Sequence, residues 1–389
     1  MNPTKTTLYF DYAATTPLDP EVAEAMMPYF NGTQSHGNPS SIHSFGRQAR
    51  TELDDARDVV AQLIGADYSE LYFTGSGTEA DNLGVIGAML AAPKERTQLI
   101  TSSIEHHAVL HSAHYLRTQG YEVTILPVDS SGLVSLATLK NALSEKTALV
   151  SLMHANNEIG SIQPIAEAAK LAHAHGAKFH TDAVQTPGVL DVSVQEIGCD
   201  LLTFCAHKIY GPKGAGALYI RQGTKVSPMI HGGSQEREKR AGTENVPAIV
   251  GFGKAAQLAK ARREADATRI TSLRDLLMTL LTDRISGIHL NGHQTQRLPG
   301  NVNVSVEGVD GTTLLMTLDR RGVAASSGSA CSSGSIEPSH VLKAIGLPDN
   351  LAASGVRFSL GRLTTQDEVV RTAEIFAEIV ERLRGVAIR

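Results

Sequence analysis

The stretch "ELYFTGSGTEA", residues 70–80, joins a short strand-like run to a cluster of small residues and the start of a helical segment. A strand followed at once by a helix is the repeating unit of an α/β fold. Backbone N–H groups and the helix dipole at such a turn form an anion site, to which the Thr78 hydroxyl adds a donor. The alternative is an ordinary tight turn. A Walker-type phosphate loop does not fit, because no Gly-Lys-Ser/Thr follows the glycines.

The same alternation of strands and helices extends on both sides of this stretch. Before it, apolar residues three and four apart predict a helix that ends at Gly65. After it, a helix is expected from Thr78 until Pro93 stops it. Further strand-like segments, with helical segments between most of them, lie at residues 97–102, 122–127, 147–153, 177–182 and 200–205. This pattern favours a mostly parallel sheet covered by helices on both faces.

The C-terminal third of the chain has a different pattern. Residues 247–285 are helical in pattern with few breakers, long enough to link two domains. The remainder predicts a smaller α+β unit, with strands in "GNVNVSVEG" and "VRFSLG" and a helix near residues 312–320. A last helix begins at the capping box formed by Thr365 and Glu368.

Composition excludes several classes of protein. The net charge is −5 with both signs interspersed, which argues against nucleic acid or an anionic membrane as the main partner. No apolar run resembles a signal peptide or a transmembrane span. Three cysteines, Cys199, Cys205 and Cys331, make a poor disulfide framework and no CxxC pair. We therefore expect a cytoplasmic protein whose thiols stay reduced.

Polar groups follow five of the six expected strands. Because ligands in an open α/β sheet bind beyond the carboxyl ends of the strands, these groups are expected to share one crevice. They are Thr78, the run Glu105 to His107, the pair Asn156 and Asn157, Asp182 with Gln185, and His207 with Lys208. Taken singly, each would be structural. Together they offer an anion cradle, an imidazole, an amide, a carboxylate and a lysine, which fits pyridoxal phosphate.

Two lysines are candidates for the Schiff base that this cofactor needs. Lys208 directly follows an apolar strand, where desolvation favours the neutral amine, and it is preferred over Lys213. A metal site was weighed for His173, His175 and His180. The first two fall on opposite sides of a helix, so no resident metal is expected.

The order and content of these motifs resemble one family over nearly the whole chain. The chain is similar to the cysteine desulfurases that feed sulfur to iron–sulfur cluster assembly, which are fold type I pyridoxal phosphate enzymes of the class V aminotransferase group. The motifs that carry the resemblance are "YFDYAATTPLDPEV", "GNPSSIHSFG", "TGSGTEADN", "EHHAVL", "MHANNEIG", "HTDAVQ", "AHKIYGPKGAGALYIR", "RAGTENVPAIVG", "SSGSACSSGSIEPSHVL" and "VRFSLGR". The resemblance implies a seven-stranded sheet in a large domain of residues 16–262. It implies a small domain of residues 1–15 and 263–389.

The resemblance also implies roles at the cofactor ring. Lys208 would form the Schiff base and move the Cα proton. Asp182 would pair with the pyridinium nitrogen, Gln185 would hydrogen-bond the phenolic oxygen, and His106 would stack on the ring and help protons at the substrate thiol. Asn157 would contact the cofactor and, with Arg357, clamp the substrate carboxylate. For Arg357 the alternative is a plain salt bridge.

At the phosphate, the resemblance implies that Gly77, Thr78 and His207 bind, and that Thr243 reaches the phosphate of the neighbouring subunit in an obligate homodimer. One position departs from the family pattern. Relatives commonly carry Ser three places before the Schiff-base lysine, and Cys205 stands there instead. A thiol is a weaker donor, so one phosphate contact would be softer.

The run "SSGSACSSG", residues 326–334, holds Cys331 in a segment with almost nothing to pack. The resemblance implies that Cys331 is the nucleophile, carried on a mobile loop of about residues 326–338. Such a loop can visit the substrate inside and an acceptor outside. Cys331 would take the sulfur of L-cysteine as a persulfide, leave L-alanine, and pass the sulfur to an iron–sulfur scaffold protein or to tRNA thiolation. When docked to a scaffold it would be a transient iron–sulfur ligand.

Two other functions stay open on the sequence. Selenocysteine lyase, or another pyridoxal phosphate lyase or transaminase, would share this scaffold. An inactive scaffold or sulfur-carrier partner would need none of the reactive groups, and the presence of Lys208, Asp182 and Cys331 argues against it.

Overall fold

The computed structural model describes residues 7–32, 36–327 and 338–387, and its largest sheet has seven strands in the order β2-β8-β7-β6-β5-β3-β4. The strands are β2 (Leu71–Thr74), β3 (Gln98–Ser102), β4 (Glu122–Leu126), β5 (Thr147–Ser151), β6 (Lys178–Asp182), β7 (Leu201–Cys205) and β8 (Gly216–Ile220). β8 runs antiparallel to both of its neighbours, and the other four pairs are parallel. The mostly parallel seven-stranded sheet is confirmed.

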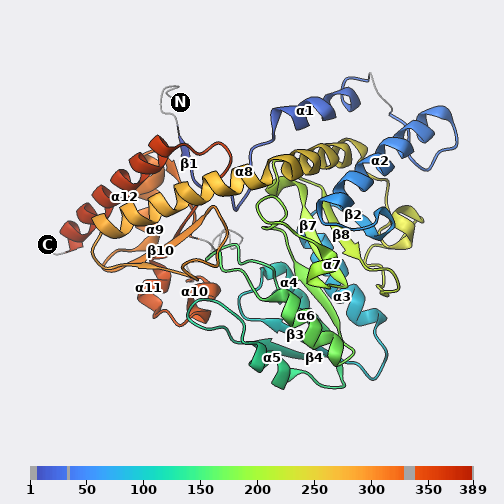
Figure 1. The fold of residues 1–389 in the computed structure, drawn as a ribbon, viewed down its shortest axis with the longest axis horizontal. Helices are drawn as coiled ribbons and strands as arrows, with labels where there is room; N and C mark the ends of the chain where they lie inside the picture. Colours follow the sequence, from blue (N-terminus) through green and yellow to red (C-terminus); the bar gives the residue numbers. More distant parts are fainter. Residues whose placement is uncertain (1–6, 33–35, 328–337, 388–389) are drawn as a thin grey trace.

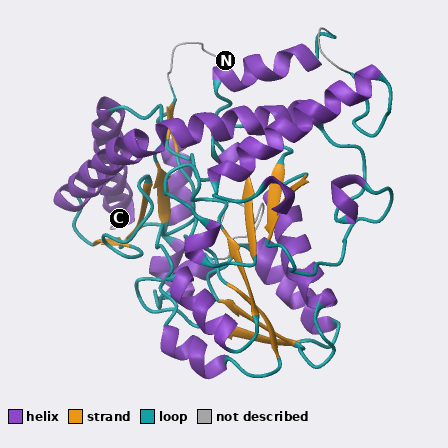
Figure 2. Ribbon diagram, turned by 45° about the vertical axis from the view of Figure 1, so that its right-hand side comes forward, coloured by secondary structure: helices purple, strands orange, loops and turns teal. Residues whose placement is uncertain are grey.

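Helices cover both faces of this sheet, as Figure 2 shows. One hydrophobic cluster draws on helices α1 (Pro20–Met26), α2 (Ser44–Leu63), α5 (Leu136–Ala142), α6 (Ile165–Ala174), α7 (Val194–Ile197) and the start of α8 (Val246–Arg284). A second cluster draws on α3 (Gly77–Ala91) and α4 (His107–Thr118). Burial of these two apolar layers holds the strand ends, and the residues that follow them, in fixed positions.

A smaller unit packs beside the large sheet. Its antiparallel strands lie in the order β12-β10-β9, and β1 pairs in parallel with β11 in a separate ladder. Its elements are β1 (Leu8–Tyr9), β9 (Ile288–Leu290), β10 (Asn301–Val306), α9 (Gly311–Arg320), β11 (Val323–Ala324), α10 (His340–Ala344), α11 (Asp349–Ala353), β12 (Val356–Ser359) and α12 (Gln366–Ala387).

Helix α8 spans both units (Figure 1). Its residues up to Ala259 join the core of the large unit, and its residues from Ile270 join the core of the small one. Leu8 and Phe10 also belong to the small core. The predicted boundaries at residues 15/16 and 262/263 stay a prediction, which this division of the apolar clusters supports.

Several helix ends lie where the sequence places them. Gly65 follows α2 with φ +67°, a left-handed conformation that costs glycine little. The capping box of α12 is formed: Glu368 N–H donates to Thr365 Oγ1 at 3.3 Å, and Thr365 N–H donates to Glu368 Oε2 at 2.9 Å. Among the described helices, we find none with both the length and the apolar character needed to span a bilayer.

Candidate active site

A cavity of about 330 Å³ lies at the carboxyl ends of the parallel strands, between the two units. Ten of the residues predicted for the site line it: Gly77, Thr78, His106, Asn157, Asp182, Gln185, Cys205, His207, Lys208 and Arg357. Of the first nine, Asp182 and Cys205 are the last residues of β6 and β7, and the other seven follow strands of the large sheet. Arg357 lies on β12 of the small unit. Most of the groups that the strand-end argument placed in one crevice line this cavity, whereas Glu105, His107 and Asn156 do not.

Lys208 ends a short 3-10 turn, Ala206–Lys208, directly after β7. Its Nζ donates hydrogen bonds to the carbonyl oxygens of Ala13 and Ala14, the latter at 2.7 Å. Gln185 Nε2 donates to the same Ala13 carbonyl at 3.1 Å. These carbonyls hold the amine at the cavity in a defined place. Lys213, the rejected candidate, is exposed and does not line the cavity.

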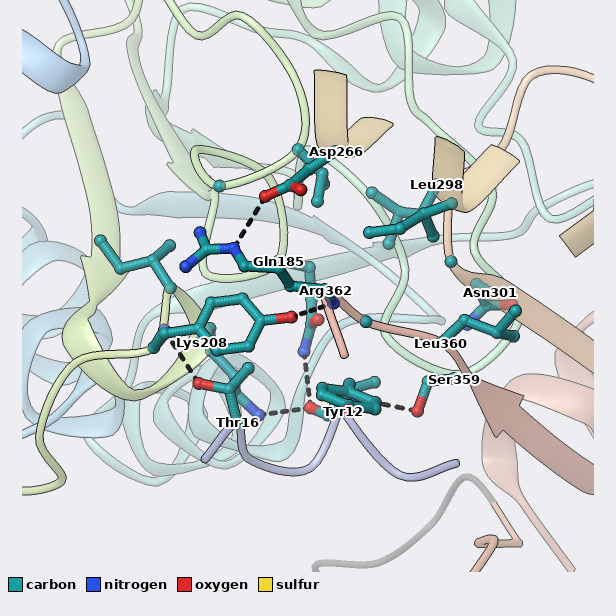
Figure 3. A pocket seen from close by; sticks show the side chains of 18 of the residues that line it. Tyr12, Thr16, Gln185, Lys208, Asp266, Leu298, Asn301, Ser359, Leu360 and Arg362 are labelled. Carbon is teal, nitrogen blue, oxygen red and sulfur yellow. Dashed lines mark hydrogen bonds and ion pairs between the residues drawn. The ribbon is translucent and has the colours of Figure 1, made fainter. Parts of the chain in front are cut away.

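Lys208 and Gln185 also face a smaller pocket of about 70 Å³, seen in Figure 3, where residues of both units meet. There Arg362 Nε pairs with Asp266 Oδ2 at 2.8 Å, and Arg362 N–H donates to the Tyr210 hydroxyl at 2.5 Å. The lysine thus lies at the junction between the units, and the docking of the small unit helps to set its position.

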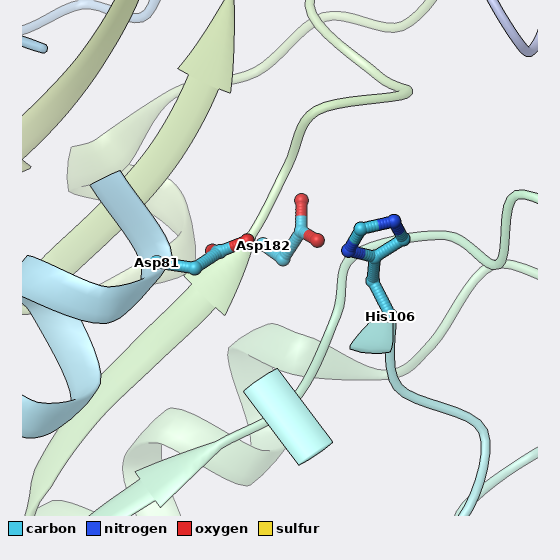
Figure 4. Close-up of side chains that lie close together, drawn as sticks. All are labelled: Asp81, His106 and Asp182. Atoms are coloured by element: carbon cyan, nitrogen blue, oxygen red, sulfur yellow. The ribbon is translucent and has the colours of Figure 1, made fainter. Parts of the chain in front are cut away.

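Two buried carboxyl groups lie side by side at the end of β6. Asp182 Oδ1 accepts a hydrogen bond from Val184 N–H at 2.9 Å, and Asp81 approaches from α3. Ligand atoms of Asp81, Asp182 and His106 all lie within 4.8 Å of one another (Figure 4). Burial raises the pKa of Asp182, which Val184 N–H and the Lys208 charge oppose. Burial, and then repulsion from Asp182, raises the pKa of Asp81 well above its usual range.

His106 forms the N-cap of α4, and that role fixes its ring. Its Nδ1 accepts a hydrogen bond from Ala108 N–H at 3.1 Å, so a neutral ring carries its proton on Nε2. Burial, and then the Lys208 charge, lowers the pKa of His106 to about 4. His106 is therefore neutral at pH 7. A neutral ring can lie flat against an aromatic cofactor and can exchange a proton through Nε2.

The N-terminus of α3 forms another part of the cavity wall. A side-chain Cβ on Gly77 would lie 3.0 Å from Val184 Cγ2 and 3.8 Å from Cys205 Sγ, so only glycine leaves the space there open. Burial raises the pKa of the Cys205 thiol to about 12, which keeps it protonated. His207 Nδ1 lies 3.2 Å from Thr15 Oγ1, and burial lowers its pKa to about 4.

Arg357 forms a salt bridge, the alternative that the sequence left open, and its role as a carboxylate clamp stays a prediction. It is only 2% exposed, and Nη2 pairs with Asp11 Oδ1 at 2.7 Å while Nη1 donates to the Asn157 carbonyl at 3.0 Å. Its Nε is buried without a hydrogen-bond partner in the described part of the chain. The arginine is thus in a salt bridge and also lines the cavity.

Two predicted residues are not placed at the cavity. Thr243 is exposed in the single chain and does not line it. Cys331 and most of the predicted loop of residues 326–338 lie outside the described residues. The proposed roles of both stay predictions.

The sequence interpretation missed several cavity residues. Asp81 lies one helical turn after Gly77, so the α3 periodicity carried a signal for it. Ala13 and Ala14 contribute carbonyl oxygens, for which no side-chain pattern exists. The histidines weighed as metal ligands have other partners: His173 Nε2 lies 2.6 Å from Asp200, and His180 is buried between Ser151 and Thr203.

Comparison with known proteins gives consistent results. A family model described as "Aminotransferase class-V" matches residues 8–371. The chain is 51% identical over 383 residues to a cysteine desulfurase IscS of Dictyoglomus turgidum, covering 98% of this chain and 97% of that protein. A solved NifS-like protein superposes with a TM-score of 0.90 at 36% identity, covering 97% of this chain and all of that one. A structure of SspA in complex with cysteine has a TM-score of 0.80 at 36% identity, covering 92% and 99%.

Proposed function

The chain belongs to the class-V aminotransferase family and to its cysteine desulfurases, and we propose how its own residues carry out that reaction. In it, L-cysteine becomes L-alanine, and its sulfur passes to the Cys331 thiol as a persulfide. Atoms balance, because the cysteine loses one sulfur that the thiol gains. The observation that supports the proposal most is the common cavity that holds Lys208, Asp182, His106 and Arg357.

The family uses pyridoxal phosphate, and the donor set of this cavity fits that group. Lys208 supplies an amine for the cofactor aldehyde, and Asp182 supplies a buried carboxylate for a protonated ring nitrogen. Gly77 and Thr78 offer open space and donors at the N-terminus of α3 for the phosphate, with His207 beside them. When bound, the cofactor supplies an electron-withdrawing ring that stabilises negative charge at the substrate Cα.

The chain's residues then bind the substrate and move its protons. Arg357 and Asn157 both line the cavity and would bind the substrate carboxylate. The Lys208 amine would take the proton from Cα and return a proton to the product. His106, neutral at pH 7 with its proton on Nε2, would donate a hydrogen bond to the substrate sulfur.

Cys331 would attack the substrate sulfur as a thiolate, the C–S bond would break, and the persulfide would be delivered to an acceptor. We propose an iron–sulfur scaffold protein as one acceptor, with tRNA thiolation as another destination. Thr243 is exposed in the single chain, as a residue that contacts a second subunit would be, so we also propose a homodimer. A reducing cytoplasm suits a thiol that must stay free. No observation favours a selenocysteine lyase or another lyase.

The test is a stoichiometric assay. Cofactor-loaded protein with L-cysteine and a thiol reductant is expected to release alanine and sulfide in equal amounts. Cys331→Ala should keep the visible absorbance of the bound cofactor and its response to cysteine, but release no sulfide. Cys199→Ala, which removes a buried thiol that does not line the cavity, is the matched control. Turnover by Cys331→Ala at the parental rate would contradict the nucleophile assignment.

A further inference from the structure

The short turn Gln235–Glu238, between β8 and α8, has a backbone conformation that residues other than glycine rarely adopt. Glu236, Arg237 and Glu238 have φ values of +46°, +51° and +66°. This left-handed region is costly for a residue with a Cβ, so a run of three persists only where the surroundings hold it, and such strain gathers at functional sites. The turn ends five residues before Thr243, the residue proposed to reach the cofactor phosphate of a second subunit.

A buried ion pair holds the turn in place. Arg57 on α2 donates to Glu236 through two nitrogens, from Nη1 to Oε2 at 2.6 Å and from Nη2 to Oε1 at 2.7 Å. The two side chains are only 3% and 2% exposed. A bidentate pair of this kind tolerates little displacement, so it fixes where the Glu236 carboxylate lies.

The same pair attaches the turn to the edge of the large sheet. β2 is the edge strand there, and an edge strand presents backbone N–H and C=O groups that need other partners. Phe73 N–H donates to Glu236 Oε2 at 2.8 Å. The Leu71 carbonyl accepts hydrogen bonds from Arg57 Nη1 at 2.9 Å and from Arg237 Nη2. The turn therefore takes the position of a further strand, and the sheet holds it there.

Two further contacts connect this turn with the segment that carries Thr243. Gln235 Oε1 accepts a hydrogen bond from Gly242 N–H at 3.1 Å, which ties the residue before Thr243 back to the turn. Arg240 Nε pairs at 2.9 Å with Oε1 of Glu79, a residue in the first turn of α3. Thr243 itself is exposed. It is thus presented outward from a segment whose preceding residues are fixed to the large unit.

We propose that Glu236 is a positioning residue that, together with Arg57, sets where Thr243 meets the cofactor phosphate of a second copy of this chain. The inference rests on the proposed function, because it uses the proposed homodimer and the proposed role of Thr243. It adds that the effect of Glu236 crosses the subunit boundary. A change at Glu236 in one chain should alter cofactor binding in its partner and leave the site of its own chain unchanged.

The first measurement is the equilibrium binding of pyridoxal phosphate to the intact chain, followed by the absorbance that depends on Lys208. Thr243→Ala and Glu236→Gln should each weaken binding by about tenfold, the lower end for a lost hydrogen bond to a charged group. Glu238→Gln is the matched control, because it changes an exposed carboxylate of the same turn, and it should leave the affinity unchanged.

Mixed dimers then assign the effect to one subunit. In each, one chain carries Lys208→Ala, so the absorbance reports only the site of the other chain, and a different affinity tag on each chain allows purification. When the Lys208 chain also carries Glu236→Gln, its site receives Thr243 from a chain with intact Glu236, and binding should match the parent. When Glu236→Gln lies instead on the Lys208→Ala chain, binding should weaken by about tenfold.

The outcomes separate this inference from the proposed function. Parental affinity in Thr243→Ala would contradict the proposed role of Thr243, and the inference would fall with it. Weak binding by Thr243→Ala beside parental binding by Glu236→Gln would overturn the inference alone. So would a loss in the mixed dimer whose Lys208 chain carries Glu236→Gln, because the ion pair would then act within its own subunit.

A second variant covers the case in which the first does not fold. Glu236→Gln leaves the Arg57 charge buried without its partner, so circular dichroism and size-exclusion chromatography must establish a folded dimer. Gln235→Ala removes the acceptor for Gly242 N–H and leaves no buried charge unpaired. In the same mixed dimers it should weaken binding in the partner's site by about fivefold, as for a lost neutral hydrogen bond. Unchanged binding there would overturn the proposal.

Discussion

The wall of the cavity that comes from the large sheet consists of side chains at strand ends, whereas the wall from the small unit consists of one arginine and two backbone carbonyls. On the sheet wall, Asp182 is the last residue of β6 and Lys208 follows β7, so the strands fix both positions. On the other wall, Arg357 is held by Asp11, and residues 13–14 reach across to Lys208. The sheet wall is set by its own core, and the second wall requires the two units to dock.

This difference predicts that substitutions on the two walls change different kinetic parameters. Changes on the sheet wall should impair the chemistry itself, because they remove groups that would touch the reacting atoms. Changes on the small-unit wall should impair substrate binding more than the rate of the chemical step.

The largest effect is expected for Lys208→Ala. The variant should lose the cofactor absorbance that depends on the amine, and turnover should fall by about 10³-fold or more, at the upper part of the range for a lost proton-transfer group. Lys213→Ala removes an exposed lysine five residues away and should keep both. Absorbance spectra and alanine release test this. Normal cofactor binding and activity in Lys208→Ala would contradict the assignment of Lys208 as the amine that binds the cofactor and transfers the proton.

Asp182→Asn is expected to have the next largest effect. The amide keeps the shape of the side chain but removes the negative charge opposite the ring nitrogen, and kcat should fall by about 10²-fold. Asp81→Asn changes the neighbouring buried carboxyl, whose raised pKa already favours its neutral form, and should cost far less. Steady-state kinetics of the two variants separates the roles. Equal losses would show that the pair acts as one unit.

Arg357→Lys tests the small-unit wall. Lysine keeps the charge but loses the planar fork that reaches Asp11 and the Asn157 carbonyl together. KM for cysteine should rise by about tenfold, since a hydrogen bond to a charged group contributes about 1.5–3 kcal/mol, and kcat should change much less. Arg269→Lys is the control, because that arginine binds backbone carbonyls of the small unit away from the cavity. A fall in kcat at constant KM would contradict the prediction that the small-unit wall acts mainly in substrate binding.

The two walls also differ in how far the sequence predicts them. On the sheet wall, a hydrophobic run marks each strand in the sequence. The residues at the carboxyl ends of parallel strands lie at the same edge of the sheet, so the positions of Asp182, His106 and Lys208 could be predicted from the sequence. The family resemblance gave the same residues their roles. Periodicity also fixed the long helix α8 to within one residue at each end.

The small-unit wall carried no comparable signal. Residues 13 and 14 act through carbonyl oxygens, and every residue has one, so no side-chain pattern marks them. The pairing of Arg357 with Asp11 joins residues 346 positions apart, and only the docking of β1 beside the small sheet brings them together. Asp81 was missed for another reason: a carboxyl group on a helix face is usually exposed, whereas this one is buried.

The smallest expected effect is a pH dependence from Glu105, a buried carboxyl group next to His106 that does not itself line the cavity. Burial raises the pKa of Glu105 to about 8, while Ser102 Oγ donates to it at 2.5 Å and Met153 N–H at 3.0 Å. Between pH 6.5 and 8 the folded chain then holds a proton that the unfolded chain has released. Stability of the cofactor-free protein should therefore fall as pH rises, by about 1 to 2 kcal/mol across that window.

The histidines of the site give the opposite slope, but at lower pH. The pKa of His106 and of His154 is lowered by burial to about 4, so their contribution to stability is lost only as pH falls below about 6.5. Glu105→Gln should flatten the curve above pH 6.5, as measured by urea unfolding. Glu122→Gln, at an exposed carboxylate paired with Lys146, should leave it unchanged. A slope that persists in Glu105→Gln would place the titrating group elsewhere, and buried Asp81, whose pKa is also raised and which lines the cavity, would be the next candidate.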